Sequence, residues 1–207
     1  MKKIIFCFFL LSISLPKLIS QTTVEEMFSI SFDVDIQTSK MYRNKIMEKA
    51  PGSKYAMYCE GWFQIKKDSL QTALTTASKL IEKYPDFLYG HLLKGNVNYY
   101  MGNYTEAIKS YNRVIDLNPK ENGGYINRAQ CKYFLEDYRG AIADYDKALE
   151  INPKPTDASY FSEAIYYRGL AEIKIGNLDE GCNNLSKAGE MGYVAAYDEI
   201  KKQCNHK

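Results

Sequence analysis

The chain has 207 residues, which is enough for one domain or repeat array with a sizeable core. Of its 27 basic residues, three lie in the first 20 positions, so the remainder carries 24 basic against 25 acidic residues and is nearly neutral. This balance argues against a partner that is mainly nucleic acid, because phosphate neutralisation needs a basic surface.

The first 20 residues have the composition of a secretory signal peptide. Lys2 and Lys3 precede an apolar run, Ile4 to Leu15, and Ser20 supplies the small residue expected at a cleavage site. The run is shorter than the ~20 apolar residues that span a bilayer, and no later segment is long and apolar enough to do so. We therefore predict that residues 1–20 are removed and that the mature chain is periplasmic or extracellular. An uncleaved anchor and a buried helix are the alternatives.

Residues 21–53 lie between this leader and the first clear repeat. Phe28 to Ile36 alternates apolar and polar residues, which is typical of a strand. Ser39 to Lys49 has the pattern of a helix, which Pro51 ends. We interpret this helix as the second half of a degenerate repeat that follows an N-terminal arm.

A 34-residue period dominates the rest of the chain. The pair Ala107-Ile108 recurs as Ala141-Ile142, and Asn118-Pro119 recurs as Asn152-Pro153, each 34 residues later. A period of this length is typical of stacked helical hairpins. The sequence therefore predicts an all-α fold, an α-solenoid of antiparallel hairpins.

About four units follow this period, and the outer two match it less closely than the inner two. Residues 156–161 are an insertion that interrupts the register before the last unit. End units of a solenoid need a cover with a polar outer face, so we expect capping helices. The predicted units are 54–87, 88–121, 122–155 and 162–195, followed by a cap and tail at 196–207.

These units resemble the tetratricopeptide repeat. That family has small residues at unit positions 8, 20 and 27, bulky residues at 4, 7, 17 and 24, and proline at 32. A small residue lets the two helices of a hairpin approach closely, and a bulky residue from the facing helix fills the remaining space. The fourth unit departs from the pattern at Gly181 and Tyr193, where alanine and proline are usual. Position 8 holds Gly61, Gly95, Ala129 and Gly169, and position 32 holds Pro85, Pro119, Pro153 and Tyr193.

The resemblance implies a binding groove, because in this family the first helix of each unit lines the concave face. Unit positions 2, 5, 9, 12 and 13 point into that face, which here is rich in tyrosine, and aromatic residues suit binding surfaces. The alternative is that some of these side chains pack between adjacent hairpins. The fourth unit also places Glu163 and Lys174 at groove positions. The predicted partner-binding residues are Tyr55, Tyr58, Trp62, Tyr89, Asn96, Tyr99, Tyr100, Gln130, Tyr133, Phe134 and Tyr166.

One ligand class of this family is excluded by the residues. Repeats that hold the acidic C-termini of chaperones use two asparagines and three cations at fixed unit positions. The corresponding residues here are Leu92, Asn96, Asn127, Glu163 and Tyr167. The asparagines are present and all three cations are missing, so we do not expect such a carboxylate clamp.

The sequence contains no motif for catalysis, cofactor binding or metal binding. It has two histidines, of which His91 stands at a packing position and His206 in the tail. Neither CxxC nor HExxH nor a phosphate-binding glycine loop occurs. Asp144 and Asp146 are interpreted as solvated residues on the exposed side of a helix. We therefore predict no catalytic residue, no metal ligand and no cofactor.

Four cysteines follow the leader, and they allow three complete pairings. An exported chain meets oxidising conditions, which permit a disulfide. Cys204 follows a short amphipathic stretch that should fold back on the helix carrying Cys182, so we predict a bond between these two; the alternative is two thiols. Cys59 and Cys131 are expected to stay unpaired.

Three functional hypotheses follow. The first is an exported protein that binds a peptide or protein of unknown identity in the aromatic groove. The second is a structural subunit or assembly factor of a cell-envelope complex, which would use the convex face or the arm at 21–53. The third, an enzyme, is disfavoured because the titratable cluster that it would need is not apparent.

Overall fold

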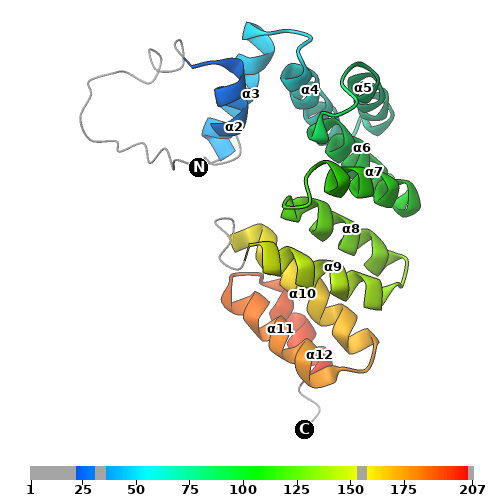
Figure 1. Ribbon diagram of the computed structural model, residues 1–207. Helices are drawn as coiled ribbons and strands as arrows, with labels where there is room; N and C mark the ends of the chain where they lie inside the picture. Colours follow the sequence, from blue (N-terminus) through cyan, green and yellow to red (C-terminus); the bar gives the residue numbers. More distant parts are fainter. Residues whose placement is uncertain (1–21, 31–35, 153–157, 205–207) are drawn as a thin grey trace, which may run out of the picture. The chain divides into compact units, whose positions relative to one another are not determined.

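The computed structural model describes residues 22–30, 36–152 and 158–204, and these residues form only helices and their connections. The all-α prediction is confirmed. The chain divides into two compact units, residues 1–60 and 61–207, and the division falls within one helix. The helices are α2 (Val24–Ile30), α3 (Ile36–Lys49), α4 (Lys54–Lys66), α5 (Leu70–Lys83), α6 (Leu88–Tyr100), α7 (Tyr104–Leu117), α8 (Asn122–Phe134), α9 (Tyr138–Ile151), α10 (Ala158–Lys174), α11 (Leu178–Glu190) and α12 (Ala195–Gln203) (Figure 1).

The first unit contains α2, α3 and the beginning of α4. The strand expected over 28–36 is wrong for residues 28–30, which belong to α2; residues 31–35 lie outside the described ranges. Phe28 is buried, and its ring lies 4.8 Å from the ring of Tyr55 and 5.3 Å from that of Tyr58. Burial of this ring against α4 outweighs the local two-residue alternation, which is a weak signal over a short segment.

In the second unit, each helix from α5 to α12 packs against the next helix in the chain (Figure 1). The first helices of successive hairpins also contact one another, α6 with α8 and α8 with α10, more extensively than the second helices do. In a curved stack of hairpins the more closely packed layer lies on the inner side. The first helices therefore line the concave side of this unit.

Each hairpin turns at the same unit position. The backbone there is left-handed, with φ of 57° at Asp68, 77° at Gly102, 62° at Glu136 and 92° at Gly176. The next amide N–H donates to the carbonyl oxygen five residues earlier, as from Asn103 to Asn98, which ends the first helix. A left-handed residue thus sets every reversal between paired helices.

The last unit ends its second helix differently from the others. The Asn-Pro pairs that follow α7 and α9 are replaced by Gly192, which has φ of 94°, and Tyr193. The amide of Tyr193 donates to the carbonyl oxygen of Ala188 at 2.9 Å. A glycine terminates α11 where proline ends the inner units, which explains why Tyr193 departs from the repeat pattern.

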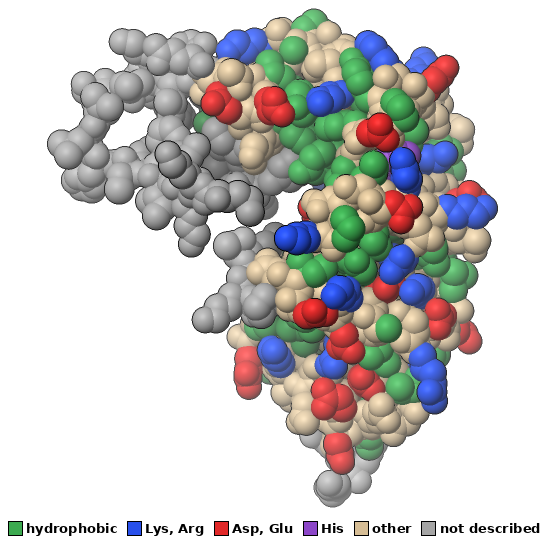
Figure 2. All heavy atoms as spheres, viewed as in Figure 1, with side chains coloured by type: hydrophobic (Ala, Val, Ile, Leu, Met, Phe, Trp, Pro, Cys, Tyr) green, Lys and Arg blue, Asp and Glu red, His purple; other side chains and the backbone are tan. Residues whose placement is uncertain are grey.

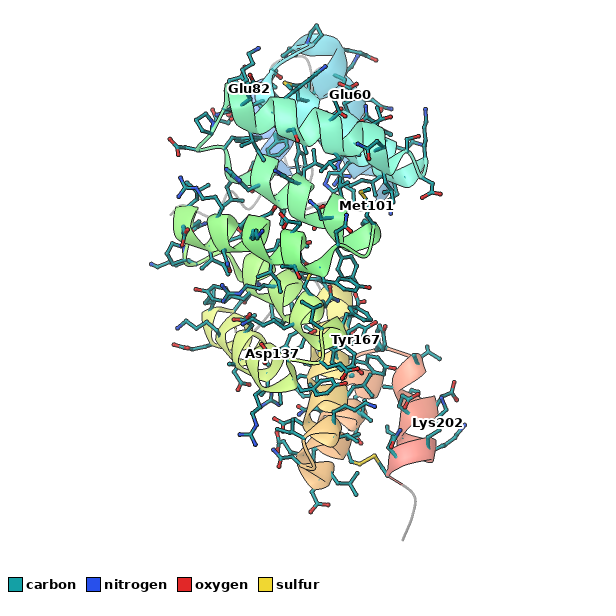
Figure 3. The ribbon with its side chains drawn as sticks, turned by 90° about the vertical axis from the view of Figure 1, so that its right-hand side faces the viewer. Glu60, Glu82, Met101, Asp137, Tyr167 and Lys202 are labelled. Carbon is teal, nitrogen blue, oxygen red and sulfur yellow. A yellow bond between two sulfur atoms is a disulfide. The ribbon has the colours of Figure 1, made fainter. Side chains whose placement is uncertain are left out.

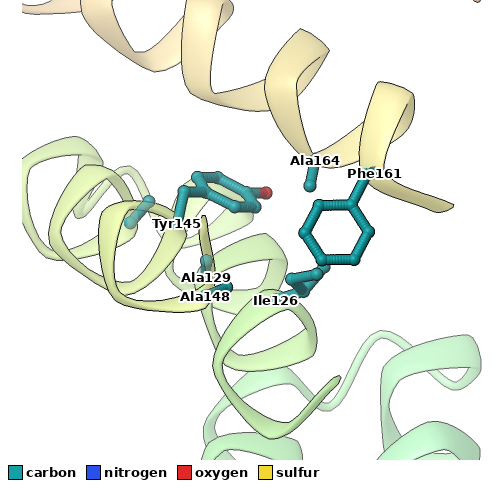
Figure 4. Close-up of a cluster of buried hydrophobic side chains, with 7 residues drawn as sticks. Ile126, Ala129, Tyr145, Ala148, Phe161 and Ala164 are labelled. Atoms are coloured by element: carbon teal, nitrogen blue, oxygen red, sulfur yellow. The ribbon is translucent and has the colours of Figure 1, made fainter. Parts of the chain in front are cut away.

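The inserted segment lengthens α10. Its last four residues, 158–161, form an added first turn of this helix, and residues 156–157 lie outside the described ranges. Phe161 packs beside Ile126 of α8 in the core of the third hairpin (Figure 4). The hydroxyl of Tyr160 donates to Asn127 Oδ1 at 2.8 Å. The insertion therefore joins α10 to α8 through the apolar packing of Phe161 and the hydrogen bonds of the Tyr160 hydroxyl, which also lies 3.5 Å from the carbonyl oxygen of Gly123.

Two arginines at the same unit position connect three helices each. Arg128 of α8 donates two hydrogen bonds to Asp144 of α9, at 2.6 and 2.8 Å, and one to Asn112 of α7 at 2.7 Å. Arg168 of α10 donates to Asp146 of α9 at 2.7 Å and to Asn184 of α11 at 2.8 Å. Each arginine links its own hairpin to the preceding one.

The interpretation of Asp144 as a solvated residue is wrong. Its side chain is 8% exposed, and besides Arg128 it forms an ion pair with Lys132, whose Nζ lies 2.8 Å from Asp144 Oδ2. Asp146 is 51% exposed, as expected. The difference arises because both cations that surround Asp144 project from the facing helix α8.

We predict that Asp144→Ala destabilises the fold by about 3 kcal/mol, because it leaves two partly buried cations without their counter-charge. Urea denaturation measures the change in the free energy of unfolding. Asp146→Ala is the matched control and should cost less than about 1 kcal/mol, since Asp146 is 51% exposed and Arg168 keeps a second carboxylate, Glu180, at 3.3 Å. Equal costs for the two variants would contradict this account.

Candidate functional site

Aromatic side chains form a connected surface on the second unit. Every ring centroid in the set lies within 6.0 Å of another, and Tyr104 stacks on Phe134 with an interplanar angle of 13° and a centroid distance of 5.1 Å. All members remain at least partly accessible to solvent. We call this set the aromatic strip: Tyr99, Tyr100, Tyr104, Tyr133, Phe134, Tyr138, Tyr166, Tyr167 and Tyr193.

The strip depends on the stacking of the first helices. α6, α8 and α10 bring their C-terminal or central turns together, so the ring of Tyr133 lies 5.3 Å from that of Tyr167. The starts of α7 and α9 add Tyr104 and Tyr138 along one edge. Figure 3 labels Tyr167, which projects from α10. The most exposed rings are Tyr100 at 53% and Phe134 at 39%.

Several tyrosines of the strip are partly buried, which affects their pKa values. Burial raises the pKa of Tyr166 to about 12, and nearby Glu199 and Tyr193 add to the rise. Burial likewise raises the pKa of Tyr167 to about 12, with contributions from Tyr193 and Glu163. These phenols stay neutral at physiological pH and present apolar ring faces with a hydrogen-bonding tip.

Sequence and fold comparisons identify the repeat. The family model described as "Tetratricopeptide repeat" matches residues 89–121 and 124–155, which are the two inner hairpins. The chain therefore contains tetratricopeptide repeats. No curated protein matches the chain.

Solved tetratricopeptide repeat structures share its fold. TTC0263 of Thermus thermophilus, described as a thermophilic protein of this type, is 14% identical with a TM-score of 0.67, covering 87% of this chain and 98% of that one. YrrB, described as having an unusual peptide-binding site, is 16% identical with a TM-score of 0.61, covering 86% and 90%. The first repeat domain of Spaghetti (RPAP3), bound to the HSP90 peptide SRMEEVD, is 16% identical with a TM-score of 0.54, covering 59% and 92%.

The structure brings together five of the predicted groove residues of this tetratricopeptide repeat protein. These are Tyr99, Tyr100, Tyr133, Phe134 and Tyr166, all members of the strip. Four strip residues were not predicted as binding residues: Tyr104, Tyr138, Tyr167 and Tyr193. The family rule names only unit positions 2, 5, 9, 12 and 13 of the first helix. It therefore misses Tyr167 at position 6 and the three residues outside the first helices, although Tyr167 directly follows predicted Tyr166 in the sequence and its ring lies 5.2 Å from that of Tyr166.

The other predicted groove residues lie elsewhere. Tyr55 and Tyr58 belong to the first unit, where Tyr58 is buried. Trp62 is half-buried near the start of the second unit, and Tyr89 pairs with Phe87 at 5.5 Å. We leave these residues out of the candidate surface.

Asn96 and Gln130 are buried, so they too are left out. Asn96 Oδ1 accepts hydrogen bonds from the Tyr111 hydroxyl at 2.8 Å and from Asn127 Nδ2 at 3.3 Å. Asn127 in turn accepts from the Tyr160 hydroxyl at 2.8 Å. The two asparagines shared with carboxylate-clamp repeats therefore tie adjacent hairpins together.

No other kind of site emerges from the described residues. Between residues 22 and 204, as far as they are described, no three His, Cys, Asp or Glu side chains gather in a way that could hold a metal ion. None of the helices α2 to α12 is long and apolar enough to cross a membrane. On the face in Figure 2, acidic and basic side chains of the second unit are interspersed. His91 Nε2 lies 2.8 Å from the carbonyl oxygen of Pro85.

The structure contains a disulfide between Cys182 of α11 and Cys204 at the end of α12 (Figure 3). It closes a segment with a sequence separation of 22 around the cap helix. Cys59 and Cys131 are buried and free. Burial raises the pKa of the Cys59 thiol to about 11 and that of Cys131 to about 12.

We predict two reactive thiols in denatured, unreduced protein that lacks residues 1–20, and four after reduction. In the native state both free thiols should react slowly at pH 8, because the raised pKa values of Cys59 and Cys131 keep the thiolate scarce and burial blocks access. Thiol counting with a chromogenic disulfide reagent measures both quantities. Four thiols without reduction would exclude the disulfide.

Proposed function

We propose that this tetratricopeptide repeat protein binds a peptide or protein segment along the aromatic strip. The connected set of accessible rings is the observation that supports the proposal, because aromatic residues provide large contact area at low conformational-entropy cost. The fold similarity to a peptide-bound repeat domain and to a protein with a peptide-binding site agrees with this role. Mechanistically, an extended or helical segment would lie along α6, α8 and α10.

The proposed role is that of a scaffold. Proteins with this fold are in general non-enzymatic, and stacked hairpins provide a surface rather than a reaction centre. We therefore propose binding without catalysis. The near-neutral charge of residues 21–207 favours a protein partner over a nucleic acid.

The strip is tested by replacing its two most exposed rings. The double variant Tyr100→Ala/Phe134→Ala should bind the peptides with an affinity at least about 30-fold lower than that of the wild type. Truncating an interface anchor commonly costs about 1–2 kcal/mol or more of binding free energy. The peptides are selected from a displayed random library against the wild-type protein, and affinities are measured by calorimetry. Circular dichroism checks that the variant remains folded.

Leu178→Ala is the matched control, because Leu178 is a 48% exposed apolar residue on α11 outside the strip. Its affinity for the selected peptides should equal that of the wild type. If the double variant also binds normally, the strip is not the binding surface. That result would favour the second hypothesis, a structural subunit or assembly factor of an envelope complex, for which deletion of the arm at 21–53 should abolish assembly.

We also propose that the protein acts outside the cytoplasm, in the periplasm or the extracellular space. The composition of residues 1–20, which lie outside the described ranges, supports this proposal. A disulfide that closes the C-terminal end agrees with it, since oxidising compartments preserve such bonds.

Export predicts a mature N-terminus at Gln21. Mass spectrometry of the protein recovered from cell fractions measures the terminus and the compartment together. Recovery of the intact chain, beginning at Met1, from the cytoplasm would contradict export.

A further inference from the structure

A carboxylate lies within the aromatic strip. Glu163 precedes Tyr166 and Tyr167 by one turn of α10, and residues three and four apart share a helix face. Burial, then neighbouring tyrosines and Glu163, raise the pKa of Tyr99; burial and Glu163 raise the pKa of Tyr193. Glu163 therefore lies near rings from α6, α10 and the turn before α12.

Glu163 has no counter-charge of its own. In the described part of the chain its carboxylate makes no hydrogen bond or ion pair, whereas Glu199, the other acid near the strip, accepts from Lys202 at 2.8 Å. The side chain of Glu163 is partly buried, and this burial raises its pKa. An ionised carboxylate in this position has lost part of its hydration and has gained no partner in exchange.

A second unsatisfied group points to the same place. The buried hydroxyl of Tyr145 has no hydrogen-bond partner among the described residues. Figure 4 shows it directed toward α10 beside Ala164, the residue that follows Glu163. Burial, followed by tyrosines and Glu163, raises the pKa of Tyr145, so the phenol stays neutral and adds no charge to the site. The charge near these rings is negative, and Lys174, the one basic groove residue of this helix, stands 11 residues farther, about 16 Å along the axis.

We propose that the strip recognises its partner by an arginine side chain, which pairs with Glu163 and stacks on the surrounding tyrosines. This inference rests on the proposed function and adds the chemistry of the partner. A guanidinium group combines a planar donor fork that matches a carboxylate with a flat face that stacks on aromatic rings. An acidic segment would instead place like charges together in a partly desolvated site.

The experiment uses two displayed peptide libraries that are identical except for the central residue, which is arginine in one and glutamate in the other. We expect the arginine library to yield binders that the strip double variant loses, and the glutamate library to yield none. Glu163→Gln should lower the affinity for the arginine peptides, measured by calorimetry, at least about 10-fold. This is the loss expected when one charged partner of a desolvated pair is removed. Glu190→Gln, an exposed carboxylate on the partner helix α11, is the control and should leave their affinity unchanged.

A stability measurement separates loss of binding from loss of fold. The folded-state pKa of Glu163 is raised, so its contribution to stability is present below the unfolded pKa and is lost as pH rises through the folded value. Glu163→Gln keeps the group neutral. It should therefore raise the urea midpoint of the free protein at pH 7 and at the same time lower the affinity for the arginine peptides.

The outcomes distinguish this inference from the proposed function. Strip-dependent binders without a preference for arginine, or arginine peptides that Glu163→Gln binds normally, would overturn the inference and leave peptide binding intact. Lysine in place of arginine should bind less well, because an ammonium group lacks the planar face; equal binding would reject stacking. The absence of strip-dependent binders from both libraries would contradict the proposed function and the inference together.

Discussion

The close approach of the two helices in each hairpin is the constraint on which the rest of the structure depends. At Gly95, an added Cβ would lie 2.5 Å from Tyr111 Cε1, and at Gly169 it would lie 2.9 Å from the carbonyl oxygen of Gly181. Because glycine stands at position 95, the ring of Tyr111 can approach α6 closely and its hydroxyl reaches Asn96. Asn96 then bonds to Asn127 of the next hairpin, so the packing within one hairpin fixes its junction with the following one.

The third hairpin shows what happens when this linkage is interrupted. Ala129 and Tyr145 repeat the small-and-large pair, but Gln130 replaces the asparagine, and within the described ranges the Tyr145 hydroxyl has no hydrogen-bond partner. The cost of a buried, unpaired hydroxyl is on the order of 1–3 kcal/mol. It falls beside α10, next to the segment that bears Glu163.

Sequence reasoning succeeded where short-range rules decide the structure. The 34-residue period and the small residues at 61, 95, 129 and 169 were sufficient for the all-α solenoid, and those positions are buried in the structure. Sequence reasoning failed where contacts between residues far apart in the sequence determine the structure. The burial of Asp144 depends on Arg128 and Lys132 across the hairpin, and the helical state of 28–30 depends on Tyr55 and Tyr58. For the candidate site, first-helix positions gave Tyr99, Phe134 and Tyr166, but the second-helix edges became visible only once the helices were stacked.

The disulfide at the C-terminal end has a consequence for how the array comes apart. In a linear stack each hairpin holds only its neighbours, so unravelling begins most easily at an end. The bond between Cys182 and Cys204 holds α12 to α11, so unfolding does not begin easily at the C-terminal end. Closing a loop of this length contributes about 3 kcal/mol in the chain-entropy account. If the protein is exported as proposed, a precursor kept reduced in the cytoplasm would lack this closure and would unfold more easily for translocation. Oxidation after translocation would then stabilise the folded state.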